Sequence, residues 1–314
     1  MFRFLYTTAL AVSALAAVPT VTLRNGVEMP LVACGSGGDS DAKAKTGVAL
    51  ALAAGYTGID TAHDYGCLKG VGEALADYGL DKRADYFLTT KVPGCGVPTQ
   101  GLQPPCFDNT VKMATADIAT LTGATGYVDL LLLHFPPLTG CSSSGDCAKI
   151  QQQWAGLEQL YAANLTRAIG VSNYCQTCIE CVLKNATVLP MVNQIQYHVG
   201  QGADPSGLLT YCKQHGIVVE AYSPLAGGKL LPWAAGDALA SKYGFNSSAQ
   251  VAFSWIAQRG LPFVTKSDNA EYLAEDLDLF GPAQHISDDD RVAIDATTAP
   301  SCSIEAPGGC CHAK

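Results

Sequence analysis

The sequence predicts a closed barrel of eight parallel β-strands surrounded by helices, the (β/α)8 TIM-barrel class. Eight short apolar runs alternate with longer amphipathic stretches along the 314 residues, as in repeated strand–helix–strand units. The runs are apolar at consecutive positions, as expected for strands covered on both faces. Eight such runs in one chain of this size favour a closed barrel over an open sheet. No linker rich in proline, glycine or serine divides the chain, so we expect a single domain.

The elements can be assigned in chain order. A hairpin comes first, because Asn25-Gly26 favours a tight turn between residues 21–23 and 27–29. The predicted barrel strands are Leu31–Cys34, Gly58–Thr61, Tyr86–Val92, Val128–Phe135, Ala168–Ser172, Val192–Tyr197, Ile217–Ser223 and Phe263–Thr265. The predicted helices include Ala42–Ala54, Val71–Tyr78, Asn109–Leu121, Ile150–Ala163, Ser206–His215 and Ser248–Arg259.

Composition excludes several classes of protein. With 48% hydrophobic residues the chain can bury a core, which a disordered protein cannot do. The net charge of −9 has the wrong sign for binding nucleic acid or an acidic membrane. A reduced cytosolic protein has little reason to hold 13 cysteines, and the odd count leaves at least one thiol unpaired or paired between chains.

The amino terminus predicts entry into the secretory pathway. One arginine precedes an apolar run over residues 4–18 that includes Ala14-Leu15-Ala16, the order of a secretory signal peptide; a buried first element is the alternative. Asn164, Asn185 and Asn246 begin N-glycosylation sequons. We therefore expect a signal peptide over 1–17, a barrel domain over 18–314, and a secreted or lumenal protein. An uncleaved terminus would leave it in the cytoplasm.

Charged side chains follow three neighbouring predicted strands. Asp60, Lys91 and His134 each stand at the carboxyl end of an apolar run, and Tyr65 lies on the loop after the first of them. In a parallel barrel these ends meet at one mouth, where active sites gather. One such charge could be a satisfied core residue, because a buried charge is costly unless it is paired. Three at one mouth predict an active site.

Seven segments resemble the aldo-keto reductase family, in the order in which that family carries them. They are GIDTAHDYG at 58–66, LTTKV at 88–92, DLLLLHFP at 129–136, AIGVSNY at 168–174, NQIQYH at 193–198, AYSPLA at 221–226 and TKS at 265–267. The similarity extends from the Asn25-Gly26 hairpin to about Phe280. Such a set is highly specific, whereas no GxGxxG or P-loop fingerprint follows a predicted strand.

By that resemblance the catalytic tetrad is Asp60, Tyr65, Lys91 and His134. The tyrosine would protonate the carbonyl oxygen as hydride reaches the carbon, although a free phenol, with a pKa of about 10, is a poor acid at neutral pH. The ammonium of Lys91 would favour the ionised phenol and make it a better donor. Asp60 would hold that ammonium charged and oriented, and His134 would donate a hydrogen bond to the carbonyl oxygen.

The resemblance also implies a nicotinamide dinucleotide extended across the barrel mouth. The residues implied are Ser172, Asn173 and Gln194 at the carboxamide, Tyr222 against the ring, Ser223 and Leu225 at the pyrophosphate, and Lys266 and Ser267 at the 2′-phosphate of NADP. A cation with a hydroxyl suits such a phosphate. Tyr272 replaces the arginine usual in the family, and Asp276 replaces an adenine-facing asparagine. NADPH is therefore expected first, with NAD use left open.

The resulting hypothesis is an NADP-dependent reductase. It would convert an aldehyde, ketone or sugar carbonyl into the alcohol, or run in reverse, as a monomer acting on a small-molecule substrate. The alternative is a secreted or lumenal barrel that binds a nucleotide or small molecule without turnover, because extracellular fluid holds little reduced nicotinamide. We expect no nucleic-acid partner and no membrane association after signal removal.

Most of the cysteines fall on or near loops after the first five predicted strands, and the C-terminal tail adds Cys302, Cys310 and Cys311. Two local bridges are plausible, Cys95 with Cys106 and Cys141 with Cys147, although connectivity cannot be deduced from sequence.

Three further cysteines, Cys175, Cys178 and Cys181, stand at helical spacing. No distant Cys/His pair completes a four-ligand metal site with them. We therefore expect no metal there, and interpret the three as disulfide partners plus a buried thiol.

Overall fold

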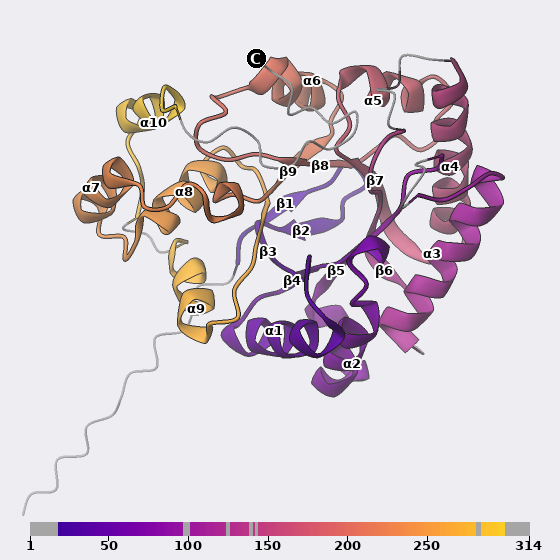
Figure 1. Ribbon diagram of the computed structural model, residues 1–314, viewed down its shortest axis with the longest axis horizontal. Helices are drawn as coiled ribbons and strands as arrows, with labels where there is room; N and C mark the ends of the chain where they lie inside the picture. Colours follow the sequence, from indigo (N-terminus) through magenta and orange to yellow (C-terminus); the bar gives the residue numbers. More distant parts are fainter. Residues whose placement is uncertain are drawn as a thin grey trace, which may run out of the picture.

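Eight parallel strands close into a barrel, with β10 hydrogen-bonded to β3 on one side and to β9 on the other (Figure 1). The structure, a computed structural model, describes residues 18–96, 101–123, 126–137, 141, 144–280 and 284–298. The barrel strands are β3 (Val32–Gly35), β4 (Gly58–Asp60), β5 (Phe87–Val92), β6 (Val128–Leu133), β7 (Thr166–Ser172), β8 (Val192–Gln196), β9 (Val218–Tyr222) and β10 (Phe263–Thr265). Each coincides with a predicted run, so the predicted fold class is confirmed.

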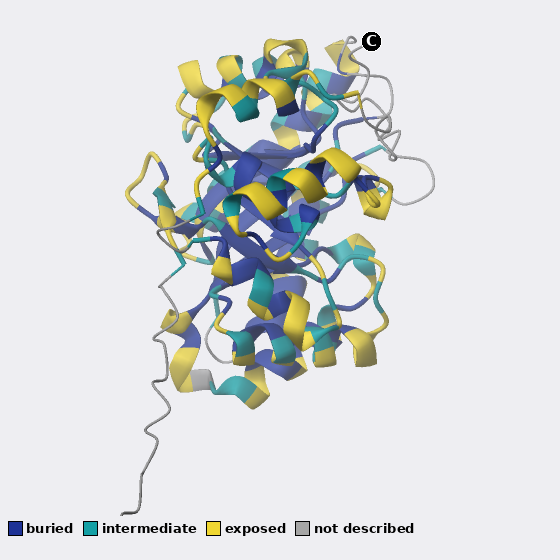
Figure 2. Ribbon diagram, turned by 90° about the vertical axis from the view of Figure 1, so that its left-hand side faces the viewer, coloured by how far each residue is buried: buried dark blue, intermediate teal, exposed yellow. Residues whose placement is uncertain are grey.

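Helices surround the barrel, with buried strands inside and exposed helix faces outside (Figure 2). They are α1 (Asp41–Ala54), α2 (Leu68–Tyr78), α3 (Cys106–Thr122), α4 (Ser144–Ala162), α5 (Gln176–Leu183), α6 (Leu208–Gln214), α7 (Ala234–Tyr243), α8 (Ser248–Ala257), α9 (Ala270–Asp278) and α10 (Asp288–Asp295). The predicted helices are all present, although α2 and α3 begin three residues and α4 six residues earlier than predicted. Within the described residues, no helix is long and apolar enough to cross a membrane.

Local sequence explains why these elements form. All six residues of β6 are buried, which accounts for its unbroken apolar run around Asp129. Helix α1 begins where the Ser40 hydroxyl accepts a hydrogen bond from the backbone N–H of Lys43. It ends at Gly55, whose φ of 102° is the left-handed conformation that glycine adopts without a steric cost.

The predicted hairpin closes one end of the barrel. Strand β1 (Thr20–Thr22) pairs antiparallel with β2 (Glu28–Pro30), and the pair lies across the barrel in Figure 1. Leu23 and Met29 are buried in a cluster with Phe87 and Met191, which stand at the amino ends of their strands. In the described part of the chain, apolar side chains thus fill this end of the barrel, and the main cavity opens at the carboxyl ends of the strands.

Within the described residues, three disulfides hold loops at the carboxyl ends of the strands. Cys95 pairs with Cys106, as predicted. The predicted pairing of Cys141 with Cys147 is wrong: Cys141 pairs with Cys178, and Cys147 pairs with Cys181.

The reason for this difference is tertiary. The pairing of β6 with β7 brings the loop after β6 against α5. Cys141 and Cys178 therefore become neighbours although 37 positions separate them in the chain, and so do Cys147 and Cys181 across 34 positions. Cys175 Sγ lies 3.7 Å from Cys178 Sγ. The three tail cysteines, like the predicted signal peptide, lie outside the described residues.

Candidate active site

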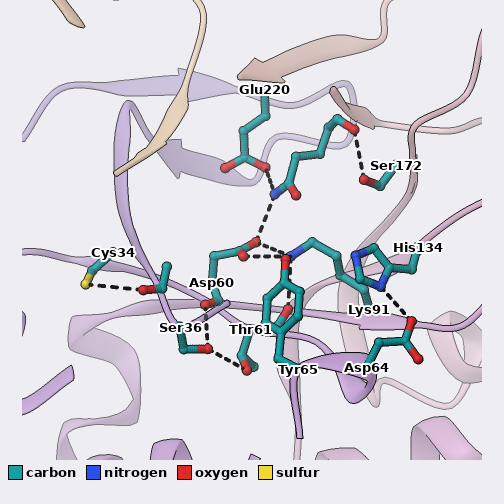
Figure 3. Close-up of polar contacts among 12 residues, drawn as sticks. Cys34, Ser36, Asp60, Thr61, Asp64, Tyr65, Lys91, His134, Ser172 and Glu220 are labelled. Atoms are coloured by element: carbon teal, nitrogen blue, oxygen red, sulfur yellow. Dashed lines mark hydrogen bonds and ion pairs between the residues drawn. The ribbon is translucent and has the colours of Figure 1, made fainter. Parts of the chain in front are cut away.

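The structure brings the four predicted catalytic side chains together at the open end of the barrel (Figure 3). Asp60 is the last residue of β4, Lys91 lies near the end of β5, and His134 directly follows β6. Tyr65 ends the short 3-10 helix His63–Tyr65 that follows β4. Asp60, Lys91 and His134 are therefore placed by the ends of buried strands, as the sequence pattern indicates, and Tyr65 by the short helix after β4.

Lys91 is the centre of the group and is fully buried. Its Nζ donates to both carboxylate oxygens of Asp60, at 2.6 and 2.8 Å, and lies 3.2 Å from the Tyr65 hydroxyl. Burial disfavours the charged ammonium, but the charges and hydrogen bonds of Asp60 and Tyr65 outweigh it, so the pKa of Lys91 is raised. The lysine is therefore a permanent cation beside the phenol.

Tyr65 stays protonated at neutral pH. Burial raises its pKa above the ordinary value of 10, and the nearby Lys91 ammonium offsets only part of that effect. The expectation that the ammonium makes the phenol a more acidic group is correct in direction, but burial is the larger influence. The phenol therefore has a proton available for donation.

His134 lies against Tyr65, with the two ring centroids 5.5 Å apart in an edge-on arrangement. Its Nδ1 lies 2.9 Å from Oδ2 of Asp64, a contact that the sequence pattern did not single out. Burial lowers the pKa of His134 below 6.5, although the hydrogen bond with Asp64 opposes that change. The imidazole is therefore neutral at pH 7.

A second buried carboxylate extends this network. Glu220 of β9 is 1% exposed, and Oε2 accepts a hydrogen bond from Gln194 Nε2 at 2.8 Å. The same Nε2 donates to Asp60 Oδ2 at 2.8 Å, so Gln194 bridges the two carboxylates. Burial and the charge of Asp60 raise the pKa of Glu220. A charged residue inside an apolar predicted strand was the available signal for it.

A cavity of about 640 Å³ opens over these residues, which is within the usual range for ligand sites. Seven of the eight predicted cofactor residues line it, together with Asp60, Tyr65 and His134: Ser172, Asn173, Gln194, Tyr222, Ser223, Leu225 and Lys266. The eighth, Ser267, lies beside a small adjoining pocket and accepts a hydrogen bond from the Asn269 backbone N–H at 3.0 Å.

Two of the lining residues have a strained backbone. Asn173 and Ser223 have φ angles of 63° and 51°, in the left-handed region that residues other than glycine rarely adopt. The Asn173 amide donates to the backbone oxygen of His134 at 2.9 Å, and its carbonyl accepts from the Tyr222 hydroxyl at 2.7 Å. Such strain persists only where surrounding contacts enforce it, and it gathers at ligand sites.

The predicted phosphate-binding cation already has an acidic partner. Lys266 Nζ donates to Asp39 Oδ1 at 2.8 Å and to the Gly37 carbonyl at 2.6 Å. The side chain of Asp39 is almost buried, whereas that of Lys266 is 38% exposed. The ammonium is therefore the more accessible member of this pair, and Lys266 lines the cavity whereas Asp39 does not.

Asp276 stands where the family has an adenine-facing asparagine, and in this structure it is bonded within the protein. Its side chain is buried and accepts hydrogen bonds from Tyr56 at 3.2 Å and Thr265 at 3.0 Å. Burial raises its pKa from 3.8 to about 7, although those hydrogen bonds lower it. Tyr272 of α9 is 58% exposed and free to reach a ligand at the surface.

Asp276→Asn is expected to flatten the pH dependence of stability. Because the folded pKa is raised, the folded protein binds more protons than the unfolded chain between pH 3.8 and about 7, so stability falls as pH rises through that window. The fall is on the order of a few kcal/mol, since one pKa unit corresponds to about 1.4 kcal/mol. Urea unfolding at pH 4.5 and 7.5 measures it. An equal fall in the asparagine variant would contradict this assignment.

Among the described residues, no group of His, Cys, Asp and Glu is arranged to hold a metal ion.

Comparison with known proteins places this geometry among carbonyl-reducing enzymes. The model of the aldo/keto reductase family matches residues 33–298. An aldo-keto reductase from Mycolicibacterium smegmatis is 37% identical over 268 residues, which are 85% of this chain and 87% of the relative. Glyoxal reductase from Bacillus subtilis is 34% identical over 280 residues, 88% of this chain and 92% of the relative.

Solved structures agree with these matches. An aldo/keto reductase from Brucella melitensis has a TM-score of 0.76 at 32% identity, covering 88% of this chain and 98% of that one. An aldo-keto reductase from Bombyx mori in complex with NADP has a TM-score of 0.74 at 28% identity, covering 89% and 92%.

Proposed function

Because the chain belongs to the aldo-keto reductase family, we propose that its mouth cavity reduces a small aldehyde, ketone or sugar carbonyl to the alcohol with NADPH. The observation that carries this proposal is the buried contact of Lys91 Nζ with both Asp60 and Tyr65 beneath that cavity. The relative named glyoxal reductase supports a small carbonyl compound as the class of substrate.

Each side chain has a definite task in this proposal. The nicotinamide, when bound, supplies the hydride. Tyr65 donates its phenolic proton to the carbonyl oxygen as charge develops there, and the Lys91 ammonium stabilises the phenolate that remains. Asp60 keeps the ammonium in place and compensates its charge. His134 faces the same cavity and orients the carbonyl oxygen.

The cavity residues fit the cofactor. Ser172 and Asn173 line the cavity where a carboxamide would lie, held by a hydrogen bond from the Asn173 amide to the Ser172 hydroxyl, and the ring of Tyr222 forms one wall. Both amide hydrogens of Gln194 are used within the protein, so its carbonyl is the atom left to accept from a carboxamide. Lys266 would pair with a 2′-phosphate, helped by Ser267, and Tyr272 could stack on an adenine. Leu225 and the strained Ser223 would border the pyrophosphate.

A reduction assay tests this function directly. Loss of NADPH absorbance is expected with at least one member of a panel of small aldehydes, α-dicarbonyls, ketones and sugars. A parallel fluorescence titration reports cofactor binding. Binding of NADPH without oxidation across the whole panel would contradict the proposal and favour a barrel that binds nucleotide without turnover.

Lys266→Ala is expected to lower the ratio of kcat/KM for NADPH to that for NADH by roughly tenfold or more, since a hydrogen bond to a charged group contributes about 1.5–3 kcal/mol. Lys43→Ala is the matched control, because Lys43 also faces Asp39 but lies at 3.6 Å and does not line the main cavity. An unchanged cofactor ratio in Lys266→Ala, with the control also unchanged, removes the phosphate role.

We also propose that residues 1–17 are a cleaved signal peptide and that residues 18–314 form one secreted or lumenal monomer. Three disulfides support an oxidising compartment. Asn164, Asn185 and Asn246 are exposed, as glycan acceptors must be. Amino-terminal sequencing of the secreted protein and glycosidase treatment test this proposal, and retention of Met1 on a cytoplasmic product would contradict it.

A further inference from the structure

Asp64 is a cavity-lining carboxylate to which the proposed reaction assigns no task. It stands between His63 and Tyr65 in the 3-10 helix, and its side chain is 18% exposed. Oδ2 lies 2.9 Å from Nδ1 of His134, a residue 70 positions away. In Figure 3 the other ring nitrogen of His134 lies on the side of Tyr65, where a carbonyl oxygen would be held.

This contact decides which ring nitrogen carries the hydrogen. A carboxylate only accepts hydrogen bonds, so Nδ1 of His134 must be the donor to Asp64. A neutral imidazole has one N–H, which leaves Nε2 with a lone pair. A lone pair faces a carbonyl oxygen unfavourably, because both atoms are acceptors.

Resting on the proposed function, we propose that Asp64 is a positioning residue that holds His134 with its hydrogen on Nδ1. His134 can then donate from Nε2 to a carbonyl oxygen only when the Asp64–His134 pair carries one further proton. With that proton the ring is an imidazolium, whose Nδ1–H is bonded to Asp64 and whose Nε2–H faces the cavity. No bond other than N–H is made, and the proton comes from solvent.

The charges around His134 set the pH at which the Asp64–His134 pair loses this proton. Asp64 and Tyr65 face the ring from the 3-10 helix, Asp60 from β4 and Lys91 from β5. Burial is the largest influence and disfavours the imidazolium; the Lys91 ammonium acts in the same direction, and Asp64 and Asp60 act against it. The pair therefore loses its proton at a pH below the usual pKa of histidine. Because reduction needs that proton, it is expected to be fastest at acidic pH.

Tyr65 cannot account for such a loss, because burial raises its pKa above 10. Glu220 also titrates in this range, because its pKa is raised to about 8, but it is joined through Gln194 to Asp60 and not to His134. A fall in reduction between pH 6 and 9 is therefore assigned to the histidine pair only when Asp64→Asn removes it.

The test is the pH profile of kcat/KM for reduction at saturating NADPH. In the wild type, kcat/KM should fall by about tenfold for each pH unit above the pKa of the Asp64–His134 pair, because the active form of the pair carries one further proton. Asp64→Asn should be nearly flat from pH 6 to 9. An amide can donate to Nδ1, so a neutral ring can then carry its hydrogen on Nε2 and donate to the carbonyl.

Asp117→Asn is the matched control. Asp117 makes an equivalent contact of 3.0 Å with Nδ1 of His63, and neither residue lines the cavity. This variant should keep the wild-type profile. Parallel profiles for Asp64→Asn and the wild type would overturn the proposal.

A second measurement does not depend on the variant or on turnover. Two-bond nitrogen–proton correlations of the ¹⁵N-histidine-labelled wild-type protein with NADPH bound report the tautomer of each imidazole. His134, identified by its loss in His134→Gln, should carry hydrogen on Nδ1 at neutral pH; hydrogen on Nε2 alone overturns the proposal. If the wild type reduces no carbonyl, the proposed function fails, while this measurement still decides the role of Asp64.

Discussion

Tyr65→Phe is expected to lower kcat/KM for carbonyl reduction by about 10²–10⁴-fold, the usual contribution of a general acid. The substitution removes one hydroxyl whose oxygen lies 3.2 Å from Lys91 Nζ, and it keeps the ring that packs edge-on against His134. Because the hydroxyl has no assigned contact with the cofactor, the dissociation constant for NADPH should be nearly unchanged. Steady-state kinetics and a fluorescence titration measure the two quantities.

Tyr78→Phe controls for the loss of a tyrosine hydroxyl elsewhere. Tyr78 lies at the end of α2 against Tyr86, away from the cavity, so its variant should keep wild-type kinetics. Full activity of Tyr65→Phe would remove the assignment of the phenol as the acid. Loss of NADPH binding together with turnover would instead show that the hydroxyl is needed to build the cofactor site.

Lys91→Met is expected to abolish turnover and to lower the free energy of unfolding by about 3–5 kcal/mol, the usual cost of breaking a buried ion pair. The cation bonds both oxygens of Asp60, and Glu220 is joined to the same carboxylate through Gln194. Without the ammonium, the buried Asp60 carboxylate remains with no compensating charge. Urea unfolding at pH 7 measures the loss.

The double variant of Lys91→Met with Asp60→Asn separates charge from packing. It removes both members of the pair and should recover a large part of the lost stability, although not the activity. Lys112→Met, on the exposed side of α3, is the matched single variant and should be within about 0.5 kcal/mol of the wild type. Equal losses for Lys91→Met and Lys112→Met would show that the buried pair does not contribute to stability.

The barrel and its four central side chains could be predicted because both depend on short-range patterns. A strand buried on both faces, such as β6, needs an unbroken apolar run, and a run is visible in the sequence without knowing its neighbours. Parallel strands end at one mouth, so Asp60, Lys91 and His134 had to converge there once the barrel was assumed.

Contacts between distant segments could not be predicted in the same way. Asp64 meets His134 across 70 residues, and Asp39 meets Lys266 across 227. At position 276 an aspartate stands where the family has an adenine-facing asparagine, and its side chain is buried against Tyr56, 220 residues away. Hydrogen-bond partners of this kind depend on side-chain directions at the ends of different strands, which periodicity does not specify.

The cysteines show most clearly which properties follow from the sequence and which follow from the fold. Their number and their positions near the ends of the first five strands are properties of the chain, and they indicate an oxidising compartment and stabilised loops. Their partners are a property of the fold: spacing favoured the bridge from Cys141 to Cys147, whereas the pairing of β6 with β7 gives each of them a partner in α5. Sequence patterns thus specify which residues reach the barrel mouth, and the packing of neighbouring strands and helices specifies which of them touch.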